Sequence, residues 1–235
     1  MRIYAIADLH LSCHENVDKP MHVFGEGWEN YEERLQEAWC ARIRDEDLVL
    51  LPGDLSWGLR LNEAKADLDW IHALPGQKIL LKGNHDLWWN RIQYLNTLYD
   101  DMFFLQNTCW VTQDGRIAVA GTRGWIHPGS EDWTEHDEKI YQRELGRMKL
   151  SLEAATASGA ETIIACMHYP PADDIVRQSE FTRILEQYGV SVCVYGHLHG
   201  AVAYGKGIKG TWNGITYHLV SLDYLGAVPK LIREE

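Results

Sequence analysis

Five short polar clusters, each placed directly after an apolar run, constrain the fold of this chain more than any other feature of its sequence. They read DLH after RIYAIA, GDL after VLLP, GNHD after ILLK, H after IIACM and GHLHG after VCVY. The runs have the length and composition of buried strands. The clusters supply donor atoms from Asp8, His10, Asp54, Asn84, His85, Asp86, His168, His197 and His199. Ligands of α/β sheets bind beyond the carboxyl ends of strands, where these clusters are expected to lie.

Strand and helix patterns alternate in the first half of the chain, and the middle is rich in strand patterns. Apolar spacing predicts helices at 31–43, 61–71, 87–98, 132–158 and 181–188. Strands are expected at 2–7, 48–51, 78–82, 102–105, 108–111, 116–121, 162–167, 191–195, 216–221 and 229–232. This order predicts an α/β fold with two mixed sheets and helices outside. The 235 residues show no linker or repeat, so we expect a single domain, 1–235.

The composition limits the partners that this chain can have. Its formal net charge of −12 disfavours binding to the phosphate backbone of nucleic acids, because such binding needs clustered lysine and arginine. The same charge does not exclude nucleotides, because bound metal cations can reverse the local field. No apolar run approaches the length that spans a bilayer, so no membrane partner is expected.

The cysteines and the start of the chain favour a cytoplasmic location. Five cysteines form an odd set without a CxxC pair, which indicates a reducing compartment rather than a disulfide framework. The first apolar run is short and Asp8 interrupts it, so it does not have the pattern of a signal peptide.

The spacing within the clusters suits metal binding. Asp8 and His10 lie two positions apart, as do His197 and His199, and residues so spaced on an extended backbone point the same way. Imidazole mixed with carboxylate favours Mn, Fe or Zn over Mg or Ca. Two such ions side by side indicate hydrolysis of a phosphate ester.

The motifs D-x-H, G-D, G-N-H-D, H and G-H-x-H, in this order from Asp8 to His199, resemble those of the calcineurin-like metallophosphoesterase superfamily. The resemblance implies a four-layer α/β/β/α sandwich. It implies one divalent ion on Asp8, His10 and His199, a second on Asn84, His168 and His197, and Asp54 bridging both. It further implies that a hydroxide bridging the ions attacks phosphorus, and that His85 protonates the leaving oxygen or stabilises the transition state.

One motif departs from the family's protein phosphatases, which carry G-D-x-x-D-R-G. Here the run is GDLSWG, and Trp57 stands where the second Asp would orient the catalytic histidine. Asp86 is the candidate substitute and is grouped with His85 as catalytic. Arg123 is the candidate for the missing phosphate-binding arginine, the alternative being an arginine on a surface loop.

Ten tryptophans are many for this length. Trp57 and Trp88 follow the motifs, so they are candidates for an aromatic wall against the substrate. The alternative is that these rings pack the core around the metal ligands.

The favoured hypothesis is a metal-dependent phosphoesterase for a small phosphate ester, with a phosphodiester or nucleotide-type substrate preferred. The alternatives are a nuclease of the same superfamily and a non-catalytic scaffold on the same fold. The sequence leaves the oligomeric state open.

Overall fold

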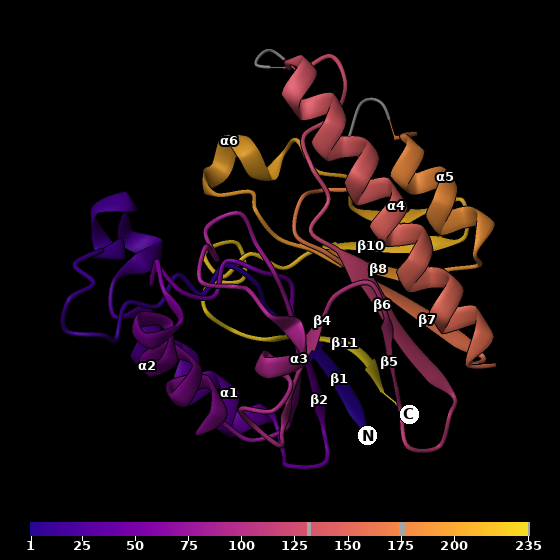
Figure 1. Cartoon of the computed structure of the whole chain (residues 1–235). Helices are drawn as coiled ribbons and strands as arrows, with labels where there is room; N and C mark the ends of the chain where they lie inside the picture. The colour runs from indigo at the N-terminus through magenta and orange to yellow at the C-terminus, as the bar shows by residue number, and fades with distance from the viewer. Residues whose placement is uncertain (131–132, 174–176, 235) are drawn as a thin grey trace. The chain divides into compact units, whose positions relative to one another are not determined.

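The chain divides into two compact units, each with its own sheet and core (Figure 1). The computed structural model describes residues 1–130, 133–173 and 177–234. The first unit comprises Met1–Phe104 and Val220–Glu235, and the second comprises Leu105–Leu219. The expectation of a single domain over 1–235 stays a prediction.

The first unit is built on a five-stranded mixed sheet. Its strand order is β11 (Lys230–Glu234), β1 (Arg2–Ala5), β2 (Leu48–Leu51), β3 (Gln77–Leu81) and β4 (Met102–Leu105). Strands β1, β2 and β3 run parallel, so their carboxyl ends reach the same edge of the sheet. The C-terminal strand β11 joins antiparallel to β1. This edge is where the first three polar clusters begin.

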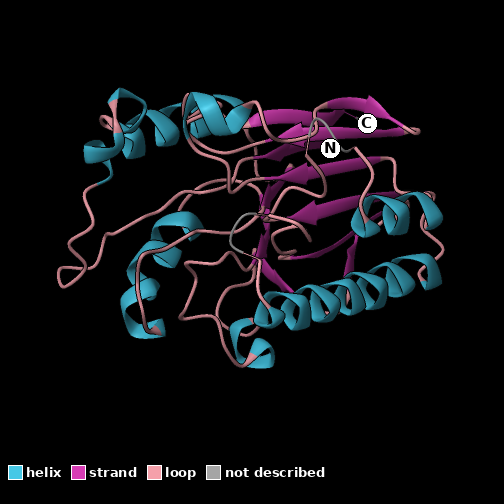
Figure 2. Cartoon of the chain, turned by 90° about the horizontal axis from the view of Figure 1, so that it is seen from above, coloured by secondary structure: helices cyan, strands magenta, loops and turns pink. Residues whose placement is uncertain are grey.

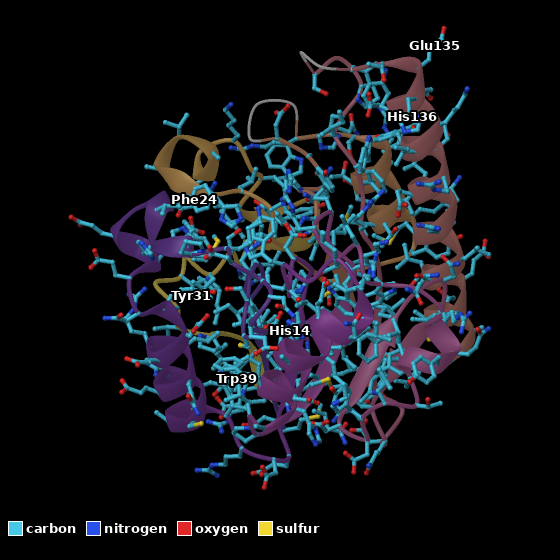
Figure 3. All side chains as sticks on the ribbon, turned by 60° about the vertical axis from the view of Figure 1, so that its left-hand side comes forward. His14, Phe24, Tyr31, Trp39, Glu135 and His136 are labelled. Carbon is cyan, nitrogen blue, oxygen red and sulfur yellow. The ribbon has the colours of Figure 1, made fainter. Side chains whose placement is uncertain are left out.

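Helices α1 (Tyr31–Arg42) and α2 (Leu61–His72) cover one face of this sheet. Helix α1 buries Tyr31 and Trp39, both labelled in Figure 3, and the indole N–H of Trp39 donates to the carbonyl of Pro75. The apolar faces of both helices pack with Tyr4, Val49 and other sheet residues in one cluster. Ahead of α1, the short 3₁₀ helices η1 (Met21–Phe24) and η2 (Glu26–Trp28) lie within the irregular segment after the first motif.

The second unit is built on a six-stranded mixed sheet. Its strand order is β5 (Cys109–Val111), β6 (Ile117–Thr122), β7 (Thr162–Met167), β8 (Val192–Tyr195), β10 (Ile215–Leu219) and β9 (Gly210–Trp212). The four central strands run parallel. The edge strands β5 and β9 pair antiparallel with β6 and β10, respectively. The polar residues after β7 and β8 therefore emerge beside each other.

The helices of the second unit are α4 (Glu135–Ala157), α5 (Glu180–Gln187) and the short α6 (Gly200–Tyr204). Figure 2 shows α4 as the longest helix. It begins with a capping box between Thr134 and Asp137, and Gly159 in the left-handed region follows its end. In the described part of the chain, no helix combines the length and the apolar composition that crossing a bilayer requires.

The predicted α/β class with two mixed sheets is confirmed, but the predicted helix at 87–98 is wrong. Only α3 (Ile92–Leu95) is helical there. Arg91 has a left-handed backbone with φ 45°, the side chain of Asn90 donates to the carbonyl of Trp88, and the indole of Trp88 donates to Asp86. These local hydrogen bonds compete with the helical ladder. The predicted start of the long helix at 132 lies outside the described residues, and the sequence patterns did not predict α6 or β9.

A buried carboxylate joins the start of the chain to the turn before β2. Asp47 is 2% exposed and accepts hydrogen bonds from the Arg2 backbone at 2.9 Å, the Arg2 guanidinium at 2.6 Å and the Arg44 backbone at 3.0 Å. Burial alone would raise the pKa of Asp47, but the hydrogen bonds from Arg2 and Arg44 outweigh it and leave the pKa below its usual value. The ionised form of Asp47 therefore stabilises the fold.

We expect Asp47→Ala to lower the free energy of unfolding by about 2 kcal/mol at neutral pH, since it removes hydrogen bonds to a charged acceptor. A lowered pKa means that this contribution is present above the usual pKa of about 4 and is lost as the pH falls through the lower value of the folded state. Urea unfolding at about pH 7 and about pH 2 checks both points. The exposed neighbour Asp45 provides the control, and Asp45→Ala should change little. Equal stability of Asp47→Ala and the parent protein at neutral pH would contradict the account.

Candidate metal and catalytic centre

The loops after β1 and β2 stay paired beyond the ends of their strands. Backbone hydrogen bonds join Asp8 N to Gly53 O, His10 N to Asp54 O and Leu11 N to Leu55 O, each at 3.0 Å. The first two motifs are therefore held in register by main-chain bonds. This pairing fixes the separation of Asp8, His10 and Asp54 before any side chain interacts.

Several of the sequence-predicted metal ligands have a strained backbone. Asp8, His10, Asp54 and His197 have φ values of 60°, 46°, 52° and 71°, in the left-handed region that non-glycine residues rarely adopt. Such conformations cost of order 1–3 kcal/mol each and concentrate at functional sites. The strain therefore supports a functional role for these positions.

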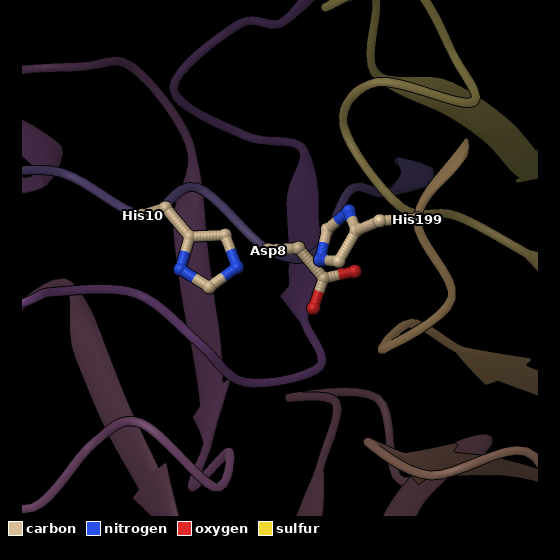
Figure 4. Close-up of side chains that lie close together, drawn as sticks. All are labelled: Asp8, His10 and His199. Carbon is tan, nitrogen blue, oxygen red and sulfur yellow. The ribbon is translucent and has the colours of Figure 1, made fainter. Parts of the chain in front are cut away.

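Asp8, His10 and Asp54 bring their donor atoms together at the sheet edge of the first unit. Figure 4 shows the Asp8 carboxylate and the His10 imidazole on the segment after β1, and their ligand atoms lie within 4.8 Å of each other. His10 Nε2 lies 3.8 Å from Oδ2 of Asp54. All three side chains are buried, at 0%, 3% and 2% exposure. Buried carboxylates beside an imidazole match the donors that transition metals accept.

The loop after β3 adds Asn84 and His85 to this edge. The backbone N–H of His85 donates to Oδ1 of Asp54 at 2.8 Å. A side chain at Gly83 would collide with the Asp54 carboxylate, so this approach requires glycine. Asn84 is half-buried, whereas His85 is exposed. An exposed imidazole on a rigid loop can reach a substrate.

Asp86 is fully buried, and its carboxylate binds backbone groups of two loops. It accepts hydrogen bonds from the N–H groups of Gly83 at 2.7 Å, Asp54 and Leu55 at 2.9 Å and Ser56 at 3.3 Å, and from the Trp88 indole at 3.2 Å. Burial raises the pKa of Asp86, with a further contribution from the charge of Asp54. These contacts are those of a group that joins the loops, and its catalytic role stays a prediction.

The two tryptophans that were candidates for substrate contact differ in position. Trp88 is fully buried and packs against Trp89 and Phe104, so its assignment to the substrate wall is corrected to core packing. The sequence alone could not show that Trp88 is buried, because a tryptophan after this motif can face either the core or the solvent. Trp57 is half-buried, and its indole lies against the rings of His10 and His85.

The second unit contributes a pair of histidines. His168 follows β7 and His197 follows β8; their ligand atoms lie within 4.8 Å of each other, and their ring centroids are 5.0 Å apart. The backbone N–H of Gly196 donates to the carbonyl of His168 at 3.1 Å, which ties the two loops together. The ring of Tyr169 packs on His197 at 4.0 Å. Two imidazoles so held can share a cation.

His199 and Arg123 complete the predicted residues of this unit. His199, also drawn in Figure 4, is half-buried at the residue before α6. Arg123 is not on the exposed surface: its side chain is 16% exposed, 3.7 Å from Glu144 and 4.4 Å from the centre of the Trp125 ring. Its carbonyl accepts the N–H of His168 at 3.2 Å. Arg123 therefore supports the His168 loop, and its contact with phosphate stays a prediction.

Sequence patterns missed two residues that support the first unit's loops. Asp67 on α2 is fully buried, accepts the N–H of Cys13 at 2.7 Å and accepts a short hydrogen bond from the Ser56 hydroxyl. The hydroxyl of Tyr31 donates to the carbonyl of His10 at 3.0 Å. The available signal was Asp67 itself, a carboxylate adjacent to Leu68 on the buried face of a predicted helix. Such a position needs a polar partner.

With this geometry in place, the comparison with known families is decisive. The sequence profile of the calcineurin-like phosphoesterases matches residues 1–201. The chain belongs to this family. Family membership supports the phosphoesterase class, and the groups of carboxylates and imidazoles described above are candidate metal ligands.

Curated relatives of this calcineurin-like phosphoesterase are distant. It is 29% identical over 200 residues to the gene 66 protein of Mycobacterium phage D29. That alignment covers 85% of this chain and 79% of the phage protein. It is 33% identical over 85 residues to an uncharacterised protein of Methanocaldococcus jannaschii. That alignment covers 36% of this chain and spans about half, 47%, of the archaeal protein.

Solved structures share the fold of this phosphoesterase. The phosphopantetheinyl hydrolase of Mycobacterium tuberculosis matches with a TM-score of 0.59 and 16% identity over 100% of this chain and 96% of that protein. A protein of unknown function from Aquifex aeolicus matches with a TM-score of 0.53 and 18% identity over 98% and 95% of the two chains.

The loop-joining role of Asp86 can be tested by Asp86→Ala. The variant leaves buried N–H groups of both loops without their acceptor, and each such group costs about 1–3 kcal/mol, so we expect the free energy of unfolding to fall by about 3 kcal/mol or more. Chemical denaturation of the metal-free protein measures this change. Asp69→Ala is the control, because Asp69 pairs with Lys65 on the exposed surface of α2 and its loss should cost less than about 1 kcal/mol. A similar small loss for both variants would show that Asp86 does not join the loops.

Proposed function

We propose that this protein is a binuclear metal-dependent phosphohydrolase that acts on a small phosphate ester, with phosphodiester or nucleotide-type substrates preferred. The observation that carries the proposal is the position of the Asp54 carboxylate. One oxygen lies 3.8 Å from His10 Nε2, and the other accepts the backbone N–H of His85. A carboxylate between two donor segments suits a bridge between two cations, and family membership supports the phosphoesterase class.

The proposed ligand sets are those that the family resemblance implies. Asp8, His10 and His199 would hold one divalent cation, Asn84, His168 and His197 would hold the other, and Asp54 would contact both. Mn, Fe or Zn fits these mixed donors best. Such a pair supplies activation of water and neutralisation of charge on phosphate oxygens.

His85 is the proposed general acid. Its imidazole is exposed, while its backbone N–H is bound to Asp54, so the side chain is available to a substrate at a fixed place. A histidine suits proton donation to a leaving oxygen because its usual pKa lies near the working pH. Asp86 acts through the loops and keeps Asp54 and His85 in place.

The substrate class follows from charge and from a missing motif. The net charge of −12 disfavours long nucleic acids, so a small ester is favoured over the nuclease alternative. The run GDLSWG lacks the Asp-Arg pair of protein phosphatases, which disfavours phosphoprotein substrates. The Arg123 guanidinium is close to Glu144, so phosphate binding by Arg123 would compete with that ion pair.

We place the enzyme in the cytoplasm, since its odd set of cysteines fits a reducing compartment.

The direct test is a substrate panel with protein that has been stripped of metal and reconstituted with Mn, Fe or Zn. The panel contains phosphomonoesters, phosphodiesters, nucleotides, a phosphopantetheine ester and single-stranded DNA. We expect metal-dependent hydrolysis of a small ester and none of DNA. Turnover of DNA would favour the nuclease, and the absence of both turnover and bound metal would favour the scaffold.

We expect His85→Ala to retain its metal content while kcat falls by roughly 10²–10⁴-fold, the usual contribution of a general acid. Metal analysis by mass spectrometry and steady-state kinetics give the two measurements. The fall should be smaller for substrates with acidic leaving groups, which need no proton. An unchanged kcat would show that another group is the acid.

We expect Asp54→Ala to lose metal and activity together, because the proposed role of this carboxylate is to hold both cations. Asp18→Ala, an exposed carboxylate in the irregular segment, is the control and should keep both. Full metal occupancy in Asp54→Ala would refute the bridging role.

A further inference from the structure

The indole of Trp57 packs against two imidazoles of the candidate centre at once. Its centroid lies 4.8 Å from that of His10 with an interplanar angle of 25°, which is a stacked arrangement. It lies 4.4 Å from that of His85 with an angle of 56°. The two imidazoles also contact each other edge to face at 5.5 Å. The three rings form one cluster, which we call the Trp57 ring cluster.

Trp57 is itself fixed from several sides. Its backbone N–H donates to the carbonyl of Leu11 at 2.9 Å, and its indole N–H lies 3.2 Å from the sulfur of Met21. The ammonium of Lys19 lies 5.7 Å from the centre of the indole ring. Met21 and Lys19 belong to the irregular segment between the first motif and α1. Trp57 is therefore held by the segment that follows the first motif.

The residues next to Trp57 anchor its loop to α2. The Ser56 hydroxyl donates to the buried Asp67 carboxylate and accepts the N–H of Gly58 at 2.9 Å. A side chain at Gly58 would collide with the backbone of Ala64 at the start of α2. The loop thus lies too close to the helix to shift, and Trp57 has a defined position before any ligand binds.

His85 gains most from such a neighbour because it is exposed. An exposed histidine side chain can sample several rotamers, and ordering it opposes the reaction through lost entropy. A misplacement of about 1 Å costs on the order of 10²-fold in rate. A rigid indole against the imidazole restricts these rotamers.

We propose that Trp57 is a positioning residue that sets the orientation of the His85 and His10 imidazoles. The proposal rests on the proposed phosphoesterase function, in which His85 is the general acid and His10 a metal ligand. It differs from a role as substrate wall, because a positioning residue acts on kcat and a wall residue on KM.

The kinetic test compares Trp57→Phe and Trp57→Leu with Trp70→Leu. Trp70 on α2 is the matched control, since it is also half-buried and packs against the same core. We expect Trp57→Leu to lower kcat by about 10- to 100-fold with KM within about twofold of the parent value. Phenylalanine keeps an aromatic face, so Trp57→Phe should retain most of the parent kcat. The control Trp70→Leu should have the same kcat as the parent protein.

The second test uses the metal-free protein and needs no activity. Scalar couplings in NMR spectra report the χ1 rotamers of the two imidazoles that the indole contacts. We expect one χ1 rotamer for His85 and for His10 in the parent protein and in Trp57→Phe, and averaging over several rotamers for His85 in Trp57→Leu. Trp70→Leu should keep the rotamers of the parent protein.

The two tests separate the possible failures. Unchanged kcat in Trp57→Leu, a rise in KM alone, or equal losses of kcat and thermal stability in both leucine variants would each overturn the proposal. Averaged His85 rotamers in the parent protein, or an unchanged single rotamer in Trp57→Leu, would also overturn it. If the parent protein hydrolyses no phosphate ester, the proposed function fails, and the χ1 couplings alone decide whether Trp57 orients the imidazoles.

Discussion

The hydrogen bonds to the Asp86 carboxylate are the interaction on which the rest of the centre depends. Asp54 has a left-handed backbone, and the consecutive N–H groups of Asp54, Leu55 and Ser56 point at one acceptor. Such a concave set of N–H groups is an anion site, and here a side chain of the protein occupies it. The N–H of Gly83 completes the set from the next loop. The side chain of Asp54 faces His10 and the backbone N–H of His85.

The second unit organises its donors by different means. His168 and His197 are joined by a backbone hydrogen bond between their loops, by ring contact and by the packing of Tyr169. Arg123 contributes its carbonyl to the His168 loop, while its guanidinium lies beside Glu144. The first unit thus offers carboxylates on strained loops, and the second offers imidazoles on a packed pair. A mixed donor set of this kind suits transition metals.

The strands could be predicted from the sequence because long-range pairing follows apolar runs. Strands β2, β4 and β7 have the predicted bounds, and α1 and α2 differ from the predicted helices by one residue at an end. The predicted helix at 87–98 was wrong because the Asn90 side chain binds the carbonyl of Trp88 and Arg91 has a left-handed backbone, neither of which periodicity registers. That the motifs follow strands was also predictable. The direction of the Asp86 carboxylate and the contacts of Trp57 were not, because both depend on loops that only the folded chain brings together.

The central proposal is that the predicted ligands hold two cations and that Asp54 contacts both. Anomalous diffraction from crystals grown with Mn²⁺ tests this most directly. We expect two peaks about 3.5–4 Å apart, joined by the Asp54 carboxylate. One peak should contact Asp8, His10 and His199, and the other Asn84, His168 and His197. A single peak, or two peaks that do not share Asp54, would contradict the proposal.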